Sequence, residues 1–410
     1  MNPTERRLIA HIAAAHALAH VIELTYAVLL TRIQGDFGTR DVIMGAIATV
    51  FGWAFGSTAI PAGFLTDRLG SRQVLVYAFG GSAVMAVIVG LAQNGWWLAA
   101  ALAGLGLTSG LYHPAGLSAM AQGVRQRGMA LGLHGVAGNL GQAVWPLLLA
   151  GTPISLAVVF DWRLGFFSVA GLSAVMAVFL ARAYLPVHGE SEVLSAEEVA
   201  EPPAEDGNAP RTNQLLAPLL VTYAAFVLSG VVYRGVITYL PKHLEELVSK
   251  DFGNAFVTVA LVLGATGQLV GGSISQRVRL ERMAPVIGLM TVPALVLTAV
   301  LSGPILVVVA SAFVFFYFAN QPVFTGLIAD YTPPGAVGRS YGVSFFAGFG
   351  LGSTGGVIAG ALVDVWDTEA AFLGLTVFMA LVVGLSVVLW TMAERRNRDV
   401  PMGTPIESAP

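Results

Sequence analysis

Three ionisable side chains share the first apolar stretch of the chain. His16, His20 and Glu23 are spaced i, i+4 and i+7, so a helix places all three on one face. An imidazole gains or loses a proton near physiological pH, and a neighbouring carboxylate adjusts that pH. Since a charged group inside a membrane costs about 2.5–3.5 kcal/mol on insertion scales, each is a candidate for function. The spacing favours a proton relay, and the alternative is a set of hydrogen bonds that only holds helices together.

Arg234 is the one basic residue deep in an apolar stretch of the second half. The two halves of the chain form a weak internal repeat with an offset of 208 residues, so that residue 112 corresponds to residue 320. The same offset aligns Arg234 with Tyr26. Tyr26 lies about one helical turn from Glu23, so Glu23 and Arg234 should lie at similar depth. We expect an ion pair between them, because an unpaired arginine at that depth is costly. The guanidinium could instead hold a carboxylate or phosphonate of a cargo, and a purely structural pair is the third possibility.

Two prolines mark matching places in the two halves. His113 stands before Pro114, and Gln321 stands before Pro322 at the equivalent repeat position. Proline removes a backbone hydrogen bond and bends a helix, so both stretches should kink beside polar side chains. These side chains either line a cavity or satisfy the carbonyl groups that proline leaves free. Further candidates for binding cargo or protons are His134, Asn139, Gln142 and Asn320.

The composition indicates a protein that crosses a membrane many times. Of the 410 residues 56% are apolar and only 11% are charged, against about 25% charged residues in a typical soluble domain. Windowed hydropathy predicts twelve helical spans in an all-α fold. The spans are residues 8–31, 41–64, 73–93, 96–122, 127–150, 164–185, 215–240, 254–276, 283–302, 304–330, 338–363 and 369–393.

The same composition argues against several other classes of protein. The chain has no cysteine, which excludes disulfides, thiolate metal ligands and a cysteine nucleophile. No nucleotide-binding glycine loop or nucleophile constellation stands out. We therefore expect no enzyme activity, no cofactor, no resident metal and no nucleic-acid partner.

An acidic, proline-rich segment divides the chain into six spans and six spans. Residues 188–213 have no apolar face, so we expect a flexible linker. The expected organisation is an N-terminal half at 1–187, a C-terminal half at 214–394 and a tail at 395–410. If both termini face the cytoplasm, 15 of the 21 Lys and Arg residues lie inside and five outside, as the positive-inside rule requires.

A charged stretch lies between the second and third predicted spans. Its marked residues are Gly63, Asp67, Arg68, Gly70 and Arg72. Charged groups cannot lie in hydrocarbon, so we expect a tight turn at the membrane edge, with the first glycine allowing close helix approach and the second forming a helix cap or turn. The stretch resembles the signature loop of the major facilitator superfamily, except that Ser71 replaces a basic residue. The resemblance implies two six-helix halves, substrate binding between them, alternating access, and a loop that latches the halves in the outward-open state.

A second resemblance covers part of the N-terminal half. Tyr112-His113-Pro114, residues 132–141 and Pro146-Leu147-Leu148 are similar to bacterial fosmidomycin-resistance-type transporters. The resemblance implies a proton-coupled exporter of small molecules, a monomer in the lipid bilayer of the bacterial inner membrane. Trp145-Pro146 replaces the Gly-Pro of the superfamily's drug antiporters, and the usual arginine of the fourth span is missing. Proton coupling would then fall on Glu23 and the histidines.

Three functions remain open from the sequence. The first is a proton-coupled antiporter that exports a small anionic or amphipathic organic molecule. The second is an importer of a small carboxylate. The third is a carrier of divalent metal ions, for which the histidines of the first half would supply imidazole ligands.

Overall fold

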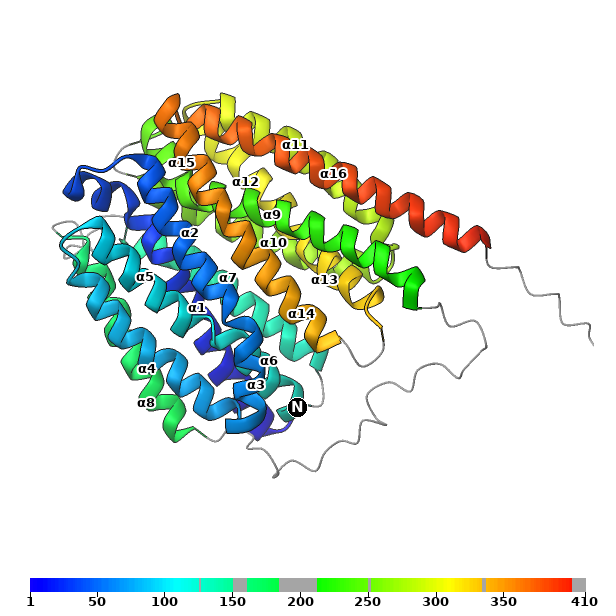
Figure 1. Cartoon of the computed structure of the whole chain (residues 1–410), viewed down its shortest axis with the longest axis horizontal. Coiled ribbons are helices and arrows are strands. Elements are labelled where there is room, and N and C mark those ends of the chain that lie inside the picture. Colours follow the sequence, from blue (N-terminus) through cyan, green and yellow to red (C-terminus); the bar gives the residue numbers. More distant parts are fainter. Residues whose placement is uncertain (125–126, 150–160, 184–211, 250–251, 334–336, 400–410) are drawn as a thin grey trace, which may run out of the picture.

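The computed structural model describes residues 1–124, 127–149, 161–183, 212–249, 252–333 and 337–399, and these are helical apart from short turns (Figure 1). The predicted linker at 188–213 lies outside the described residues except for the start of one helix, and so does most of the predicted tail. The first half contains α1 (Pro3–Phe37), α2 (Asp41–Ser57), α3 (Ala59–Leu69), α4 (Ser71–Gly90), α5 (Gly95–Ser109), α6 (Tyr112–Gly123), α7 (Arg127–Leu149) and α8 (Arg163–Arg182). The second half contains α9 (Thr212–Leu247), α10 (Gly253–Ser275), α11 (Leu280–Val300), α12 (Pro304–Ala319), α13 (Gln321–Asp330), α14 (Val337–Phe345), α15 (Gly355–Val365) and α16 (Thr368–Asp399).

These helices form twelve membrane spans in two six-helix halves, as the hydropathy predicts. Four spans are interrupted, namely α2 with α3, α5 with α6, α12 with α13 and α14 with α15. The last of these also contains a π-helical stretch, Phe346–Gly350, and a 3₁₀ stretch, Leu351–Thr354, between its two α-helices. Ten spans in the described residues are long and apolar enough to cross a membrane by length and composition alone. The other two are α5–α6, which is broken, and α7, in which His134, Asn139 and Gln142 lower the hydropathy.

Each of the two predicted kinks coincides with a short interruption between two helices. α5 ends at Ser109 and α6 begins at Tyr112, which puts Pro114 in the first turn of α6. α12 ends at Ala319 and α13 begins at Gln321, which puts Pro322 in the same place. The first turn of a helix tolerates proline because its N–H groups have no partner within the helix.

The predicted ten-residue turn at residues 63–72 is wrong in its extent. α3 continues to Leu69 and α4 begins at Ser71, so the turn is Gly70 alone. Gly70 has φ of +79°, which residues with a Cβ rarely adopt, and this matches the turn role expected for it. Hydropathy ended the span too early because a helix satisfies its own backbone and can continue beyond the hydrocarbon.

The role expected for Gly63 is also wrong in this structure. A Cβ added at Gly63 would meet no described atom within 4 Å, so this glycine does not bring two helices together here. Close approach occurs earlier, where Gly45 and Gly56 of α2 face the segment before and within α15. A Cβ at Gly56 would lie 2.5 Å from the Cα of Gly350, and one at Gly45 would lie 2.7 Å from the carbonyl carbon of Gly356. Small residues thus allow the backbones of the two halves to touch.

The two ends of the helix bundle differ in how they join the halves. We call the end that carries Asp41, Lys242 and Asp364 the Asp41 end, and the opposite end, at the α3–α4 junction, the Asp67 end. At the Asp41 end, Lys242 Nζ lies 2.7 Å from both carboxylate oxygens of Asp41. Nearby, Asn254 donates a hydrogen bond to the carbonyl of Val28 over 3.1 Å. Such bonds between halves gather at mid-depth and at the Asp41 end, so the structure is closed there.

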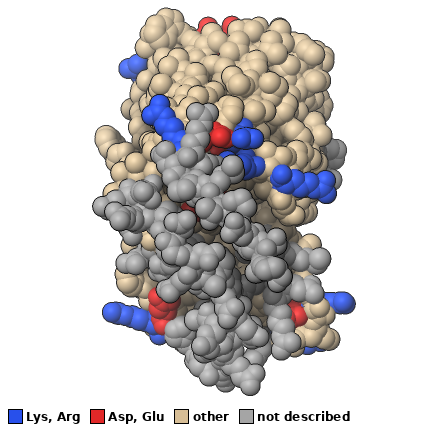
Figure 2. Space-filling view, turned by 90° about the vertical axis from the view of Figure 1, so that its right-hand side faces the viewer, with Lys and Arg blue, Asp and Glu red and all other residues tan. Residues whose placement is uncertain are grey.

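Basic side chains are visible from the side of the molecule where α16 ends. Figure 2 shows both Lys or Arg groups and Asp or Glu groups on the described part of this face. Arg68 and Arg72, which flank the α3–α4 junction, are exposed, and so is Arg282 near the start of α11.

Candidate functional site

The centre of the site is an ion pair between the two halves. Glu23 of α1 accepts a hydrogen bond through Oε1 from Nη2 of Arg234 on α9, over 3.0 Å. The two side chains are only 4% and 6% exposed. The pair expected from the sequence is therefore present. Because each charge would be costly alone in this environment, each holds the other in place.

The guanidinium of Arg234 has hydrogen-bond donors that its contact with Glu23 does not use. Its contact with Glu23 uses one guanidinium nitrogen, and its buried Nε has no hydrogen-bond partner among the described residues. The hydroxyl of Thr238, one turn further along α9, is likewise buried and without a partner there. Buried donors normally find partners, so two unused ones on one helix face are a suitable place for an acceptor such as an anion.

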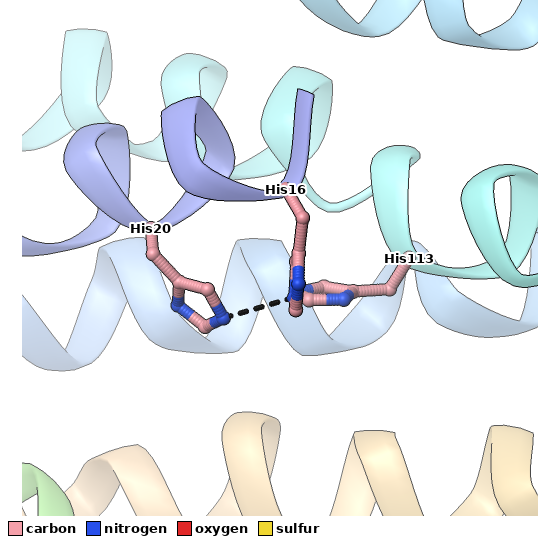
Figure 3. Close-up of side chains that lie close together, drawn as sticks. All are labelled: His16, His20 and His113. Carbon is pink, nitrogen blue, oxygen red and sulfur yellow. Dashed lines mark hydrogen bonds between the residues drawn. The ribbon is translucent and has the colours of Figure 1, made fainter. Parts of the chain in front are cut away.

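A chain of imidazoles extends from the other oxygen of Glu23. Oε2 lies 3.0 Å from Nδ1 of His20, whose Nε2 lies 3.1 Å from Nε2 of His16. Nδ1 of His16 then lies 2.7 Å from the backbone carbonyl of His134. Figure 3 shows His16 and His20 side by side on one helix, joined through their ring nitrogens.

The partners of this chain decide where its protons lie. A carbonyl only accepts, so His16 carries hydrogen on Nδ1, and an ionised Glu23 only accepts, so His20 does the same. Neutral imidazoles then present two bare Nε2 lone pairs to each other at 3.1 Å. Two lone pairs at that distance repel unless a cation lies between them. A cation between the two Nε2 atoms would remove this repulsion.

Gln142 connects this chain to the other half. Its amide nitrogen lies 2.9 Å from Nδ1 of His20 and 2.9 Å from the hydroxyl of Tyr233 on α9, while its amide oxygen has no partner among the described residues. Exchanging the amide oxygen and nitrogen removes the conflict of two donors at His20, because the oxygen then accepts from His20 and from Tyr233, while the amide nitrogen takes the position that has no partner among the described residues. In that orientation Gln142 joins α1, α7 and α9.

Two more histidines surround His16. The ring of His134 stacks on it with centroids 3.7 Å apart and 9° between the planes, and Nε2 of His134 lies 3.0 Å from the hydroxyl of Tyr112. The ring of His113 lies 5.3 Å from that of His16 and stacks at 5.4 Å on Phe345 of the second half. The histidine cluster thus touches the second half through an aromatic ring as well.

The remaining candidates lie beside this network. Asn139 of α7 donates a hydrogen bond to Gln268 of α10, which is another link between the halves. Asn320 and Gln321 line a cavity of about 40 Å³, and the buried Oδ1 of Asn320 has no partner among the described residues. Tyr233 lines the same cavity, so it separates the cavity from the histidine chain.

The residues of the signature stretch stand apart from this site. Asp67, Arg68 and Arg72 are exposed at the Asp67 end, at the far end of α3 and the start of α4. The sequence argument missed Tyr112, Tyr233 and Gln268 as members of the site. Each is a polar side chain within an apolar span, and the same criterion that selected the histidines could have found them.

Comparisons with known proteins agree with this architecture. Residues 12–356 match the sequence pattern of the Major Facilitator Superfamily. The chain is 24% identical to the fosmidomycin resistance protein of Escherichia coli (strain K12), over 95% of this chain and 93% of that protein. It is 23% identical to the D-galactonate transporter of Escherichia coli O6:H1, over 91% of this chain and 92% of that protein. A solved bacterial homologue of the human lysosomal transporter Spinster, inward-facing and unoccupied, superimposes with a TM-score of 0.81 at 14% identity, covering 96% of this chain and 98% of that one.

Proposed function

This chain belongs to the Major Facilitator Superfamily of membrane transporters, and we propose that it couples the movement of a small organic anion to that of protons. Cargo binds between the two halves, which alternately open to the two sides of the membrane. Its place is the bacterial inner membrane, with both termini in the cytoplasm and the Asp67 end on the cytoplasmic side. The unit that works is a monomer. The proposal depends on one observation, the buried pair of Glu23 and Arg234 with the histidine chain attached to it.

The ion pair provides the coupling. A carboxylate beside an arginine keeps its charge, and one that loses this partner takes up a proton more readily. An anion that engages the free donors of Arg234 draws the guanidinium away from Glu23, and Glu23 then takes up one proton by way of the His16–His20 chain, so that a proton enters the site with the anion. By thermodynamic linkage, a protonated Glu23 frees Arg234 for the anion to the same extent.

The sign of this coupling bears on direction. Anion and proton each favour the binding of the other, which suits movement of both in the same direction, as in the uptake of a small carboxylate. Exchange of an exported molecule for a proton, which the resemblance to fosmidomycin-resistance transporters implies, needs the two to compete. We place cotransport first, and exchange is the alternative that the experiment distinguishes.

The cavity lined by Asn320, Gln321 and Tyr233 is the starting point for the cargo site. Its volume of about 40 Å³ holds a few water molecules and no organic molecule, and all of its lining residues lie in the second half, so the site must enlarge towards the first half before a cargo binds. D-Galactonate, named for one relative, is a carboxylate, and fosmidomycin, named for another, is a phosphonate. An anion of either kind suits a planar guanidinium.

The test uses purified protein in vesicles that contain a pH-sensitive dye. We expect D-galactonate added outside to acidify the lumen if proton and anion enter together, whereas exchange makes the lumen alkaline. Glu23→Gln should abolish this proton movement yet preserve counterflow of labelled D-galactonate, and Arg234→Ala should abolish both. His20→Gln should shift the pH optimum. His11→Gln, on the same helix and outside the chain of hydrogen bonds, is the matched control. Wild-type pH dependence in Glu23→Gln would remove Glu23 from the coupling.

A further inference from the structure

The histidines of the first half form a cluster that proton transfer does not fully use. His16, His20 and His113 each offer a ring nitrogen, and these three atoms all lie within 4.8 Å of one another. Figure 3 shows the three rings converging, two from α1 and the third from α6. In the proposed function His113 has no part, although it is buried among the other two.

Two of these imidazoles are already oriented as metal ligands usually are. Histidine ligands commonly donate their second ring N–H to a carboxylate or a backbone carbonyl, which fixes the ring and leaves the other nitrogen bare. His20 does so towards Glu23 over 3.0 Å, and His16 does so towards the carbonyl of His134 over 2.7 Å. Their bare Nε2 atoms face each other at 3.1 Å. This is the arrangement that calls for a cation.

We propose that His16, His20 and His113 bind one divalent transition-metal ion, such as Zn²⁺, between their converging rings. Zn–N bonds of about 2.0–2.1 Å in a tetrahedron put ligand nitrogens roughly 3.3 Å apart. The Nε2 atoms of His16 and His20 are already close to that separation. His113 must move inward by about 1.5 Å at most, which rotation of its side chain supplies.

The ligand set and the local charge select the kind of metal. Neutral imidazoles suit Zn²⁺, Co²⁺, Ni²⁺ and Cu²⁺, whereas Mg²⁺ and Ca²⁺ prefer oxygen ligands. The carboxylate of Glu23 stands behind His20 and offsets part of the ion's charge, while it also neutralises Arg234. Three protein ligands leave a fourth position for water.

Occupation of this site would block the proton path. A metal ion on the two Nε2 atoms occupies the space between the rings of His16 and His20, which lie 3.1 Å apart there, so a proton can no longer pass directly from one ring to the other. The proposal that the site binds metal does not depend on the proposed function. The proposal that the metal inhibits transport does depend on it. In this proposal Zn²⁺ binds to the histidines and inhibits transport, and it is not itself transported.

The binding test uses Co²⁺ as the probe on tag-free protein. Tetrahedral Co²⁺ absorbs strongly in the visible range, so we expect bands that Zn²⁺ abolishes by displacement. His113→Gln should remove these bands, and Glu23→Gln, which loses an orienting partner, should weaken affinity by about 10–100-fold. His11→Gln should leave the spectrum unchanged. Absence of tetrahedral bands in the wild-type protein overturns the site whatever the variants do, and so would equal binding by His113→Gln.

The second test separates the site from the transport cycle. In the dye-loaded vesicles, Zn²⁺ should stop anion-driven proton movement in the wild-type protein and leave His113→Gln active. Since the Co²⁺ spectrum is measured without transport, it stands even if the proposed cargo is wrong. Zn²⁺ binding without loss of flux would overturn the inhibition, and accumulation of Zn²⁺ in the vesicles would make the metal a cargo instead.

Discussion

The carboxylate of Asp364 accepts hydrogen bonds from the backbone N–H groups of Asp41 over 2.9 Å and of Val42 over 3.0 Å. A side chain of the second half therefore caps the N-terminus of α2 in the first half. The partial positive charge of a helix N-terminus favours a carboxylate there. Arg40 adds an ion pair to Asp364 at 3.3 Å. Together with Lys242 and Asp41, these contacts hold the Asp41 end closed.

Loss of this cap should open the Asp41 end more often. Asp364→Ala removes a capping interaction of about 1 kcal/mol, which shifts the ratio of closed to open molecules by about fivefold. Ala48→Cys places a thiol on the buried face of α2 that touches Gly356, and the chain has no other cysteine. We expect maleimide to label this thiol about five times faster in the Asp364→Ala background.

The matched control for the cap is Asp367→Ala. Asp367 lies at the same end and caps Ala370 within its own half, through a hydrogen bond of 2.7 Å. Its removal should leave the labelling rate unchanged. Equal rates for the two variants would mean that the cap across the halves does not keep this end closed.

The buried ion pair should show strong coupling in a double-mutant cycle. Removing one partner of a buried pair leaves an uncompensated charge, at a cost of about 3–5 kcal/mol. We expect Glu23→Gln and Arg234→Gln each to lower the melting temperature clearly when made alone, and the two combined to lower it much less than the sum of the two single effects. If the double variant is as unstable as the sum of the two single ones, the pair is not energetically coupled.

The signature stretch should affect transport more than stability. Asp67 lies in the last turn of α3, where a negative charge is unfavourable by about 0.3–1 kcal/mol. Asp67→Asn should therefore leave the melting temperature equal or slightly higher, preserve binding of D-galactonate and slow its transport. A variant that binds the anion poorly but moves it at the normal rate would contradict the latching role.

Two glycines on one span should respond in opposite ways. Gly56→Ala brings a methyl group against the backbone of Gly350, so we expect a loss of about 1–3 kcal/mol in stability. Gly63→Ala meets nothing within 4 Å and gains helix propensity, so it should be neutral or stabilising by up to about 1 kcal/mol. Thermal unfolding in detergent measures both. Loss of transport in a stable Gly63→Ala would reveal a close contact in another conformation.

The spans could be predicted from the sequence because the bilayer imposes a length and a polarity on each one. Their ends could not. α9 continues to Leu247 instead of residue 240, and α3 continues to Leu69 instead of residue 64, since a helix supplies its own hydrogen bonds in water and in lipid. The breaks at Pro114 and Pro322 were predictable as bends because the cause, a missing N–H, is visible in the sequence.

The candidate site was predictable in part. Spacing on one helix brought His16, His20 and Glu23 together, and the repeat offset placed Arg234 at their depth. Depth alone does not give rotation about the helix axis, so Gln142 and Tyr233 were not matched across the halves. The cap formed by Asp364 could not be predicted from the sequence either, because its partners are backbone N–H groups, which every residue except proline carries.

Between α14 and α15 the backbone passes through a π-helical stretch, Phe346–Gly350, and then a 3₁₀ stretch, Leu351–Thr354. The first is wound more loosely than an α-helix and the second more tightly, so their deviations oppose each other. A change that passed a residue from one stretch to the other would rotate α14 against α15 about the helix axis while the chain remained helical. Phe345 and Phe349, which stack on His113, lie at this joint and would turn with it. Such a rotation within the α14–α15 span would move the rings of Phe345 and Phe349 onto or away from the imidazole of His113 in the opposite half.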